Sequence, residues 1–488
     1  MLVTRMSAKP TAVDVHGFGG GFTLGAVDAG WDLQACVTRE VGFGVLVKLA
    51  NRSKLGDSWE SITAKPNEWD QLDVFKADMV MGNPPCSGFS TLSSKAFRGD
   101  DSVANDFMWE LINYAGRVAP EIVIFESVQQ TFRQGLKLMR RLHARLEEIS
   151  GLKYNLLHVL HNNASHGGAS TRRRYFWVAT RVPFGVDHGR VNRAGEFVDL
   201  DGIATLGDAL RDLEPLSLTM SEQPYRGTEI NHTGHETRED CTEECTVYVV
   251  NSTRWCRREV HDGTGLVDGH DVGRSPSLGR AQELLSLADW PEGDTVSTVL
   301  RRYYQEHGDL PSMWHYPTRE DKLDEYGNPV LDDTGTVVKV SLPKAERLIK
   351  TDFAMGHNQI GRWYWDRMAR VVTGGGVHLI LHPHLPRTLT QREVARVQGF
   401  PDDWKIFPVR FAPDLGPAWG KGVPVQAGRW IARWARASLE GEPGPLTGVP
   451  LAEYDKRLFK LHGGHDRELV IDTTNDYKPW AAARGDKG

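Results

Sequence analysis

A cysteine follows an apolar run in the segment Gly82-Asn83-Pro84-Pro85-Cys86. It comes after Asp78–Met81 and stands between a stiff Pro-Pro and a flexible Ser-Gly. A thiol at the carboxyl end of a buried strand is placed as a nucleophile would be placed. A buried structural cysteine is the alternative, because free cysteine also behaves as a small apolar residue.

A carboxylate ends a second apolar run, where Glu126 follows Ile122–Phe125. A carboxylate is costly to bury unless it is paired or protonated. Glu126 could therefore act as a general acid, although a helix-capping role would place it there too.

Three consecutive arginines, Arg172-Arg173-Arg174, lead into the apolar run Tyr175–Val178. In a strand, Arg172 and Arg174 would share one face, where they could contact phosphate or a base. A solvated basic run is the alternative.

A glycine-rich turn, Gly17–Gly21, separates the apolar run Ala12–Val15 from an expected helix. Glycines let the backbone come close to a cofactor at the start of the helix. A tight turn without a ligand would look the same.

These segments are positioned by alternating strands and helices over residues 12–185. The expected strands are short apolar runs at Ala12–Val15, Gln34–Val37, Asp78–Met81, Glu121–Phe125 and Tyr175–Ala179. Helical stretches lie between them at Phe22–Ala29, Asp106–Arg117 and Gln134–Ile149. The alternation predicts a doubly wound parallel α/β sheet, which binds ligands at the carboxyl ends of its strands.

The alternation stops after residue 186, which gives four expected segments. They are a first catalytic part (1–186), a less regular insert of mixed or mostly β character (187–380), a return segment (381–440) and an appendage (441–488). Turn residues at 332–335 predict a hairpin in the insert. Helical periodicity returns at Thr390–Gln398 and Val425–Leu439.

The composition, with 40% hydrophobic and 25% charged residues among 488, excludes a disordered or fibrous chain. Five cysteines cannot form a disulfide framework, so we expect a reducing compartment, the cytoplasm. No signal peptide or membrane span is expected.

The net charge of −6 conceals two basic stretches. Residues 133–174 contain nine Lys/Arg and two acidic residues, and residues 387–436 contain nine Lys/Arg and four acidic residues. These stretches could contact phosphates.

Taken together and in order, the motifs resemble those of the DNA cytosine-C5 methyltransferase family. The glycine turn, Pro-Pro-Cys, Glu-x-Val, Arg-x-Arg, the segment RTLTQREVARVQGFPDDW (387–404) and Gly420–Val425 cover about 12–185 and 380–440. The resemblance implies a Rossmann-like, S-adenosylmethionine-dependent methyltransferase domain. It also implies that about 190–375 is an inserted target recognition domain.

The resemblance also implies roles for individual residues. Cys86 would add to C6 of a cytosine flipped out of double-stranded DNA, Glu126 would act at N3, and Arg172 would hold O2. The resemblance suggests substrate contacts from Ser90, Arg174 and Arg392, with Arg174 supporting the loop. Residues expected around the donor are Asp14, His16, Gly19, Gly21, Phe22, Glu40, Asp57, Pro84, Lys421 and Val423. We expect the protein to act as a monomer.

The sequence departs from the family pattern at His16, Thr38, Ser127 and Lys421. Thr38 replaces the ribose-binding acid, although Glu40 follows on the same strand face. A lysine ~4 Å from a sulfonium would be repelled by about 4 kcal/mol at an effective dielectric near 20. Lys421 could instead point toward a phosphate or an acid, or mark an inactive enzyme. It could also neutralise a carboxylated donor, carboxy-S-adenosylmethionine, which would yield 5-carboxymethylcytosine.

Two other functions stay open from the sequence. One is a catalytically silent DNA-binding protein, and the other is an RNA cytosine-C5 methyltransferase of the same fold. The insert also contains a weak zinc candidate, formed by Cys241, Cys245, Cys256 and His261.

Overall fold

The fold is that of a computed structural model, which describes part of the chain. The described residues are 9–39, 43–56, 58–85, 88–89, 99–100, 102–186, 204–211, 247–250, 253–256, 284, 288–321, 324, 330–332, 337–353, 360–369, 371–372, 380–384, 389, 391–404, 420–444, 449–450 and 469–472.

One sheet joins nine strands of the described chain in the order β14-β15-β6-β7-β5-β4-β1-β2-β3. β1, β2, β3, β4 and β5 run parallel, whereas β7 pairs antiparallel with both β5 and β6. Their bounds are β1 Thr11–Val15, β2 Asp32–Arg39, β3 Glu60–Ala64, β4 Met79–Gly82, β5 Ile122–Ser127, β6 Asn155–Asn162, β7 Arg173–Thr180, β14 Val449–Pro450 and β15 Leu469–Asp472.

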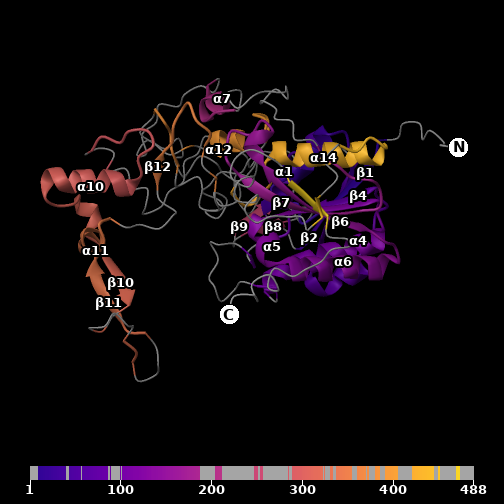
Figure 1. Cartoon of the computed structure of the whole chain (residues 1–488), viewed down its shortest axis with the longest axis horizontal. Coiled ribbons are helices and arrows are strands. Elements are labelled where there is room, and N and C mark those ends of the chain that lie inside the picture. Colours follow the sequence, from indigo (N-terminus) through magenta and orange to yellow (C-terminus); the bar gives the residue numbers. More distant parts are fainter. Residues whose placement is uncertain are drawn as a thin grey trace.

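Helices cover both faces of this sheet (Figure 1). One apolar core contains residues of α1 (Gly21–Asp28) and α14 (Val425–Leu439), and the other contains residues of α4 (Asp106–Val118) and α6 (Leu136–Ser150). Shorter helices α2 (Phe43–Ala50), α3 (Arg52–Leu55) and α5 (Gln129–Gln134) complete this part. The predicted doubly wound α/β class is confirmed, and β1 and β4 meet at the point where the strand order reverses.

The return segment closes the same domain that the N-terminal part begins. Gly428 of α14 approaches Phe22 of α1, and the Trp31 indole donates to the carbonyl of Ala432 at 2.9 Å. The expected helix at Val425–Leu439 is therefore a structural part of the sheet domain.

The C-terminal strand β15 also belongs to the sheet. Leu469–Asp472 pairs antiparallel with β6, from Leu160 to Leu157. These residues lie within the expected appendage (441–488), and their backbone groups extend the sheet at the edge of β6.

The insert contains a separate apolar core, which includes Trp290, Leu300, Trp314 and Leu348. Its elements are α7 Leu206–Leu210, α10 Val296–His307, α11 Lys344–Lys350, β8 Val247–Val250, β9 Thr253–Cys256, β10 Pro317–Asp321, β11 Lys339–Pro343, β12 Gly361–Arg362 and β13 Ile380–Leu381. Helix α10 was not predicted.

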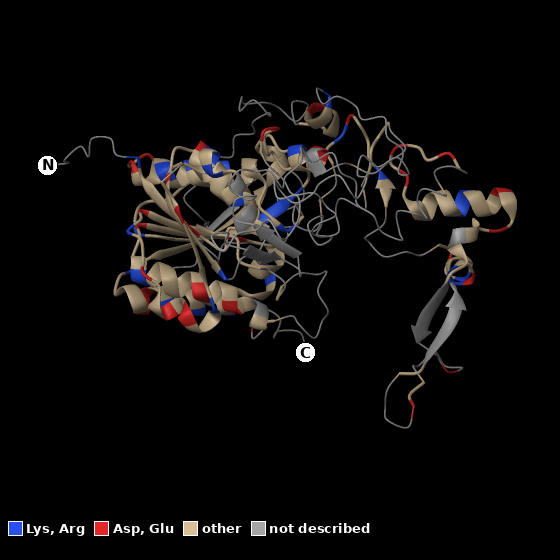
Figure 2. Ribbon diagram, turned by 180° about the vertical axis from the view of Figure 1, so that it is seen from behind, with Lys and Arg blue, Asp and Glu red and all other residues tan. Residues whose placement is uncertain are grey.

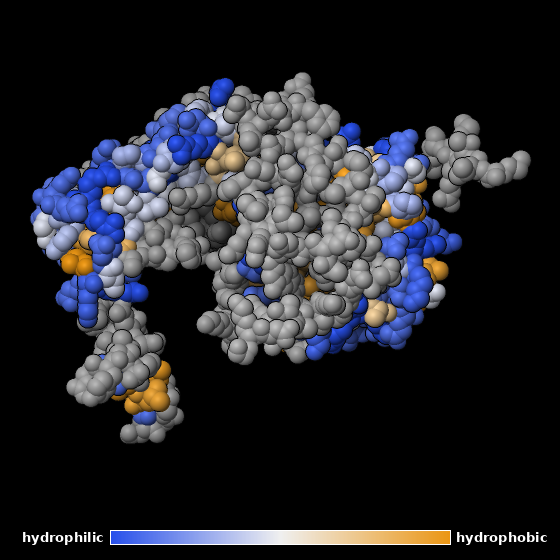
Figure 3. All heavy atoms as spheres, in the orientation of Figure 1, coloured by the Kyte–Doolittle hydropathy of each residue, from blue (hydrophilic) through white to orange (hydrophobic). Residues whose placement is uncertain are grey.

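The predicted hairpin in the insert lies on a projecting arm. Leu331 and Val337 form an antiparallel bridge, and β10 pairs with β11 beyond it. The arm extends away from the sheet domain (Figure 1), and apolar atoms gather near its far end (Figure 3). Leu331 is one of the exposed large apolar side chains.

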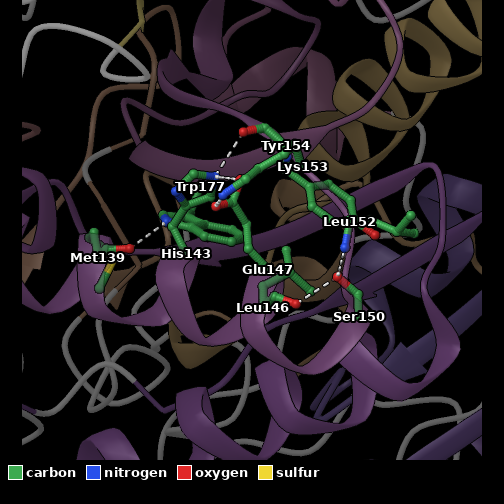
Figure 4. A network of polar contacts seen from close by, with 9 residues as sticks. All are labelled: Met139, His143, Leu146, Glu147, Ser150, Leu152, Lys153, Tyr154 and Trp177. Atoms are coloured by element: carbon green, nitrogen blue, oxygen red, sulfur yellow. Dashed lines mark hydrogen bonds and ion pairs between the residues drawn. The ribbon is translucent and has the colours of Figure 1, made fainter.

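A polar network fastens the end of α6 to the sheet (Figure 4). The Tyr154 amide donates to Glu147 at 3.0 Å, and the Trp177 indole donates to the carbonyl of Met139 at 3.3 Å. The imidazole of His143 lies 2.9 Å from the carbonyl oxygen of Tyr154. These bonds fix α6 on the face of β6 and β7.

No helix within the described residues is long and apolar enough to cross a membrane. Basic and acidic residues are interspersed over the ribbon (Figure 2). The basic cleft suggested by local charge counts therefore stays a prediction.

Helix α12 (Gln391–Val397) and residues 398–404 pack beneath the glycine turn. A Cβ placed at Gly20 would lie 3.2 Å from the Trp404 ring, and one at Gly21 would lie 3.2 Å from Phe400. Phe400 and Trp404, which belong to the segment 387–404, thus pack against the glycine turn.

Candidate active site

Glu126 lies at the carboxyl edge of the sheet, between residues from two neighbouring strands. Asn83, directly after β4, donates from Nδ2 to Glu126 Oε2 at 2.6 Å. Arg174 in β7 forms an ion pair with Glu126 Oε1 through Nε. All three residues are buried, and Asn83 leads through Pro84 and Pro85 to Cys86.

The environment of Glu126 favours its neutral form more than water does. Burial raises the pKa of Glu126 to about 7, and the neighbouring Arg174 opposes the rise. A carboxyl with a pKa near neutrality can give or take a proton at physiological pH. Glu126 does not cap α5, whose N-cap is Val128 and has no side-chain cap.

Arg172 contacts backbone carbonyls instead of the acid. Its guanidinium is completely buried and donates to Val372 at 2.6 Å and to Gly422 at 2.7 Å. Among the described residues Arg172 has no carboxylate partner. Arg172 thus joins the start of β7 to two segments that follow it by 200 and 250 positions.

The positions of the two arginines differ from the expected roles. Arg172 was expected at the base and Arg174 at the loop, but Arg174 is the arginine beside Glu126. Because β7 begins at Arg173, Arg172 lies just outside the strand, where its side chain reaches the return segment.

Asp14 at the end of β1 supports the glycine turn from within. Its Oδ2 accepts from Thr23 at 2.7 Å and forms a buried ion pair with Lys48 Nζ at 2.8 Å. A Cβ at Gly17 would lie 1.9 Å from that carboxylate. Oδ1 has no hydrogen-bond partner within the described part of the chain.

Cys36 lies beside Asp14 and is unsuited to nucleophilic chemistry. Its Sγ is 3.7 Å from Asp14 Oδ2, and burial raises the pKa of the thiol to about 12.

The turn is open at one glycine and closed at another. No atom of the described residues lies within 4 Å of a Cβ placed at Gly19, whereas a Cβ at Gly21 would meet the Val423 carbonyl oxygen at 1.9 Å. The segment Gly420–Val423 therefore lies against the turn. Val423 is buried, and Lys421 is exposed with no carboxylate partner among the described residues.

His16 lies in a buried polar and aromatic cluster beside the turn. Its Nδ1 is 3.3 Å from Thr38 Oγ1, and its Nε2 is 3.1 Å from Glu110 of α4. Arg39 also binds Glu110, through Nε at 2.7 and 2.8 Å. Burial lowers the pKa of His16, although Glu110 opposes this effect.

Two aromatic rings complete the cluster. The ring of Trp69 lies 4.7 Å from His16, and that of Phe107 lies 5.0 Å from it. His16 and Phe18 have φ values of 58° and 47°, a left-handed conformation that is strained for such side chains. Backbone strain of this kind is typical of ligand-binding turns.

The remaining expected site residues are only partly accounted for. Phe22 packs in the core at 5.9 Å from Phe176, and Pro84 is buried. Of Arg392 and Cys256 the structure describes only the backbone. Those outside the described residues are Glu40, Asp57, Cys86, Ser90, Cys241, Cys245 and His261. Within the described residues no group of His, Cys, Asp and Glu could hold a metal.

Four residues of the site were missed from the sequence: Lys48, Arg39, Glu110 and Asn83. Lys48 and Glu110 look like ordinary charges of amphipathic helices, so periodicity gives no sign of them. Asn83 could have been found, because its position next to the Pro-Pro-Cys segment places it beside the adjacent strand.

A doubly wound sheet with a glycine turn at its switch point and buried acids at the carboxyl ends of its strands defines a Rossmann-like α/β protein. The chain belongs to the C-5 cytosine-specific DNA methylase family, whose model matches residues 19–435. The resemblance inferred from the sequence is thereby confirmed.

Curated relatives are longer than this chain. DNA (cytosine-5)-methyltransferase CMT3 of Arabidopsis thaliana is 23% identical over 409 residues, which is 75% of this chain and 45% of that protein. DNA (cytosine-5)-methyltransferase 2 of Zea mays is 38% identical over 89 residues, which is 16% of this chain and 10% of that protein. The chain thus spans less than half the length of these relatives.

Similar solved structures include Dnmt2 of S. pombe and the methyltransferase EhMeth of Entamoeba histolytica. The Dnmt2 match has 14% identity and a TM-score of 0.40, and covers 89% of this chain and 99% of that one. The EhMeth match has 10% identity and a TM-score of 0.43, with the same coverage.

Proposed function

We propose that the protein transfers a methyl group from an S-adenosylmethionine-type donor to C5 of cytosine in double-stranded DNA. The observation that carries this proposal is the buried contact of Glu126 with Arg174 and with Asn83, which precedes Cys86 by three positions in the chain. This arrangement supports an acid and an anion-stabilising arginine beside a thiol nucleophile.

In the proposed reaction the Cys86 thiolate adds to C6 of a cytosine that has left the base stack. The addition pushes electron density into the ring, toward N3 and O2. Glu126 gives a proton or a hydrogen bond to N3, and Arg174 stabilises the charge on O2. C5, made electron-rich by the addition, would then bond to the transferred carbon of the donor, and the donor's thioether would leave. Loss of the C5 proton and of the Cys86 thiolate then restores the aromatic ring.

The glycine turn supports a site for S-adenosylmethionine, which supplies an electrophilic methyl carbon when bound. Three observations fit such a ligand. Gly19 faces open space, Asp14 keeps a buried carboxylate oxygen without a hydrogen-bond partner among the described residues, and His16 brings polar groups to the same end of the sheet. Phe22 fits less well, because it packs in the core.

The test is transfer from labelled S-adenosylmethionine to duplex DNA, followed by mass spectrometry of the nucleosides. We expect 5-methylcytosine with the wild type and none with Cys86→Ala. We expect Glu126→Gln to be slower by about 10²- to 10⁴-fold, the usual value of general acid catalysis. A covalent complex on DNA containing 5-fluorocytosine should need Cys86. A protein that binds DNA without product or adduct would instead be the silent binding protein.

Lys421 favours a second candidate donor, carboxy-S-adenosylmethionine. Its segment lies against the glycine turn through Val423, and the exposed ammonium group has no carboxylate partner among the described residues. A donor carboxylate would supply the missing partner, and the product would be 5-carboxymethylcytosine.

Nucleoside mass spectrometry with each donor separates the two candidates. If the carboxylated donor is used, Lys421→Asn should reduce carboxymethyl transfer and raise methyl transfer. If only 5-methylcytosine forms and Lys421→Asn changes nothing, the carboxylated donor is excluded.

A further inference from the structure

We propose that Asn83 is a positioning residue that fixes the Glu126 carboxyl in one orientation and thereby sets its protonation during the reaction. This inference rests on the proposed function and adds a residue to it. Asn83 follows β4 directly, and Glu126 occupies the next position of β5, since Gly82 pairs with Phe125 in the parallel register. The backbone therefore delivers the two side chains to one place.

The hydrogen bond between Asn83 and Glu126 is short and buried. The donor and acceptor atoms are 2.6 Å apart, and the exposed fractions of Asn83 and Glu126 are 6% and 1%. A hydrogen bond to a charged acceptor is strong in such surroundings, because water does not compete for it. The bond therefore restricts rotation of the carboxyl group.

Asn83 also leaves the two carboxyl oxygens unequal. Its amide N–H occupies Oε2, whereas Oε1 lies against Arg174. The amide therefore restrains Oε2 while the guanidinium restrains Oε1, and together they hold the carboxyl group in one orientation. In the acid form of Glu126, the carboxyl proton passes to N3 when the thiolate adds, and it returns to Glu126 when the thiolate leaves.

An asparagine suits this task better than the other small polar residues. An amide donates to the carboxylate without adding a charge, so it orients Glu126 without adding a second charge beside it. An aspartate at this position would add a second negative charge next to the first and raise the pKa of the pair. Of the charged groups facing Glu126 in the described chain, Arg174 is the direct partner. His161 of β6 lies opposite Arg174 in the antiparallel register of the sheet.

The experiment compares wild type, Asn83→Ala and Asn83→Asp by single-turnover transfer across pH, with saturating DNA and labelled donor. The wild-type rate should fall as pH rises through the pKa of Glu126, because the acid form is consumed. Asn83→Ala should move this fall to higher pH and lower the plateau by about tenfold, the value of one hydrogen bond to a charged group. Asn83→Asp should move the fall in rate to a still higher pH. Its transfer rate should recover at low pH, where the introduced carboxyl is protonated and can donate a hydrogen bond to Glu126.

The control is Asn113→Ala, which removes a half-buried amide of α4 that accepts from Arg145 at 3.2 Å, away from Glu126. It should lower stability slightly and leave the pH profile unchanged. Asn83→Ser, which keeps a small donor, replaces Asn83→Asp if that variant does not fold.

The outcomes separate the two proposals. If the wild type transfers the group but the Asn83 variants keep its pH profile and plateau, the role of Asn83 is wrong and the proposed function stands. If the folded wild type transfers nothing to cytosine while Asn83 and Cys86 are intact, the proposed function fails, and the role of Asn83 fails with it.

Discussion

Arg172 and Gly422, 250 positions apart in the chain, are joined by a 2.7 Å hydrogen bond from a completely buried guanidinium. The same guanidinium donates to Val372 at 2.6 Å. Three parts of the chain therefore meet at one cation: the start of β7, the end of the insert and the segment beside the glycine turn. The planar fork of arginine suits this task, because it bonds two carbonyls in different directions at once.

Replacing Arg172 should loosen the segment beside the turn. Arg172→Met leaves two buried carbonyls without their donors, which costs about 1–3 kcal/mol for each unsatisfied group. We expect faster hydrogen exchange of the amides at 420–423 and a higher KM for the donor. Arg181→Met is the control: this exposed arginine lies just beyond the other end of β7, and its replacement should change neither quantity.

Replacement by alanine should reduce stability at Gly17 but not at Gly19. A Cβ at Gly17 would lie 1.9–2.2 Å from the Asp14 carboxyl, so Gly17→Ala should lower the free energy of unfolding by about 1–3 kcal/mol, the usual cost of overpacking. The Cβ of Gly19→Ala meets no atom of the described part of the chain within 4 Å, so this variant should keep the wild-type Tm.

Donor binding is the second measurement for this pair. If the donor lies on the glycine turn, Gly19→Ala should weaken S-adenosylhomocysteine binding in a calorimetric titration, since the new methyl group enters the ligand's space. Unchanged binding by Gly19→Ala would place the donor elsewhere.

The strands that carry unbroken apolar runs could be predicted from the sequence, and those with polar residues could not. β1, β4, β5 and β7 are buried on both faces, as the runs imply. β6 was missed because His158 and His161 interrupt its apolar pattern, although both are buried. Strand β3 lies at the edge of the sheet, where exposed positions hide the strand pattern.

The site was predictable where the residue type itself limits the chemistry. Glu126 stood out as a carboxylate that ends an apolar run. Lys48 did not, because a lysine on a short helix usually points to solvent and only the tertiary fold brings it to Asp14. The contact of Arg174 with Glu126 was not predicted for the same reason, since spacing gives the strand face but not the partner.

The buried pair of Lys48 and Asp14 should be important for stability. Lys48→Met leaves the Asp14 carboxylate buried without its cation, which costs about 3–5 kcal/mol for a pair of this kind. Urea unfolding measures the loss. The double variant Lys48→Met/Asp14→Asn removes both charges and should recover a large part of it. If the double variant is as unstable as the sum of the two single variants, the pair is not coupled.

A surface lysine gives the matched control for that change. Lys54 contacts the exposed carboxylate of Asp403. Lys54→Met should cost less than about 1 kcal/mol, because solvent-exposed ion pairs contribute little.

His158 should make the protein less stable as the pH falls. Burial, with a smaller effect of Arg140, lowers the pKa of His158 to about 3, whereas an unfolded histidine titrates near 6.5. Between these values the unfolded chain binds a proton that the native chain does not. The free energy of unfolding therefore falls by about 1.4 kcal/mol per pH unit as the pH drops from 6.5 toward 3.

Replacing His158 with a residue that does not titrate should remove this contribution. His158→Gln should flatten the dependence of unfolding free energy on pH by about 1.4 kcal/mol per unit below pH 6, measured by urea unfolding. Tyr175→Phe removes the hydroxyl 2.5 Å from His158 Nδ1 but keeps the histidine, so it should lower stability and preserve the slope. An equal slope in wild type and His158→Gln would mean that His158 is protonated in the native protein.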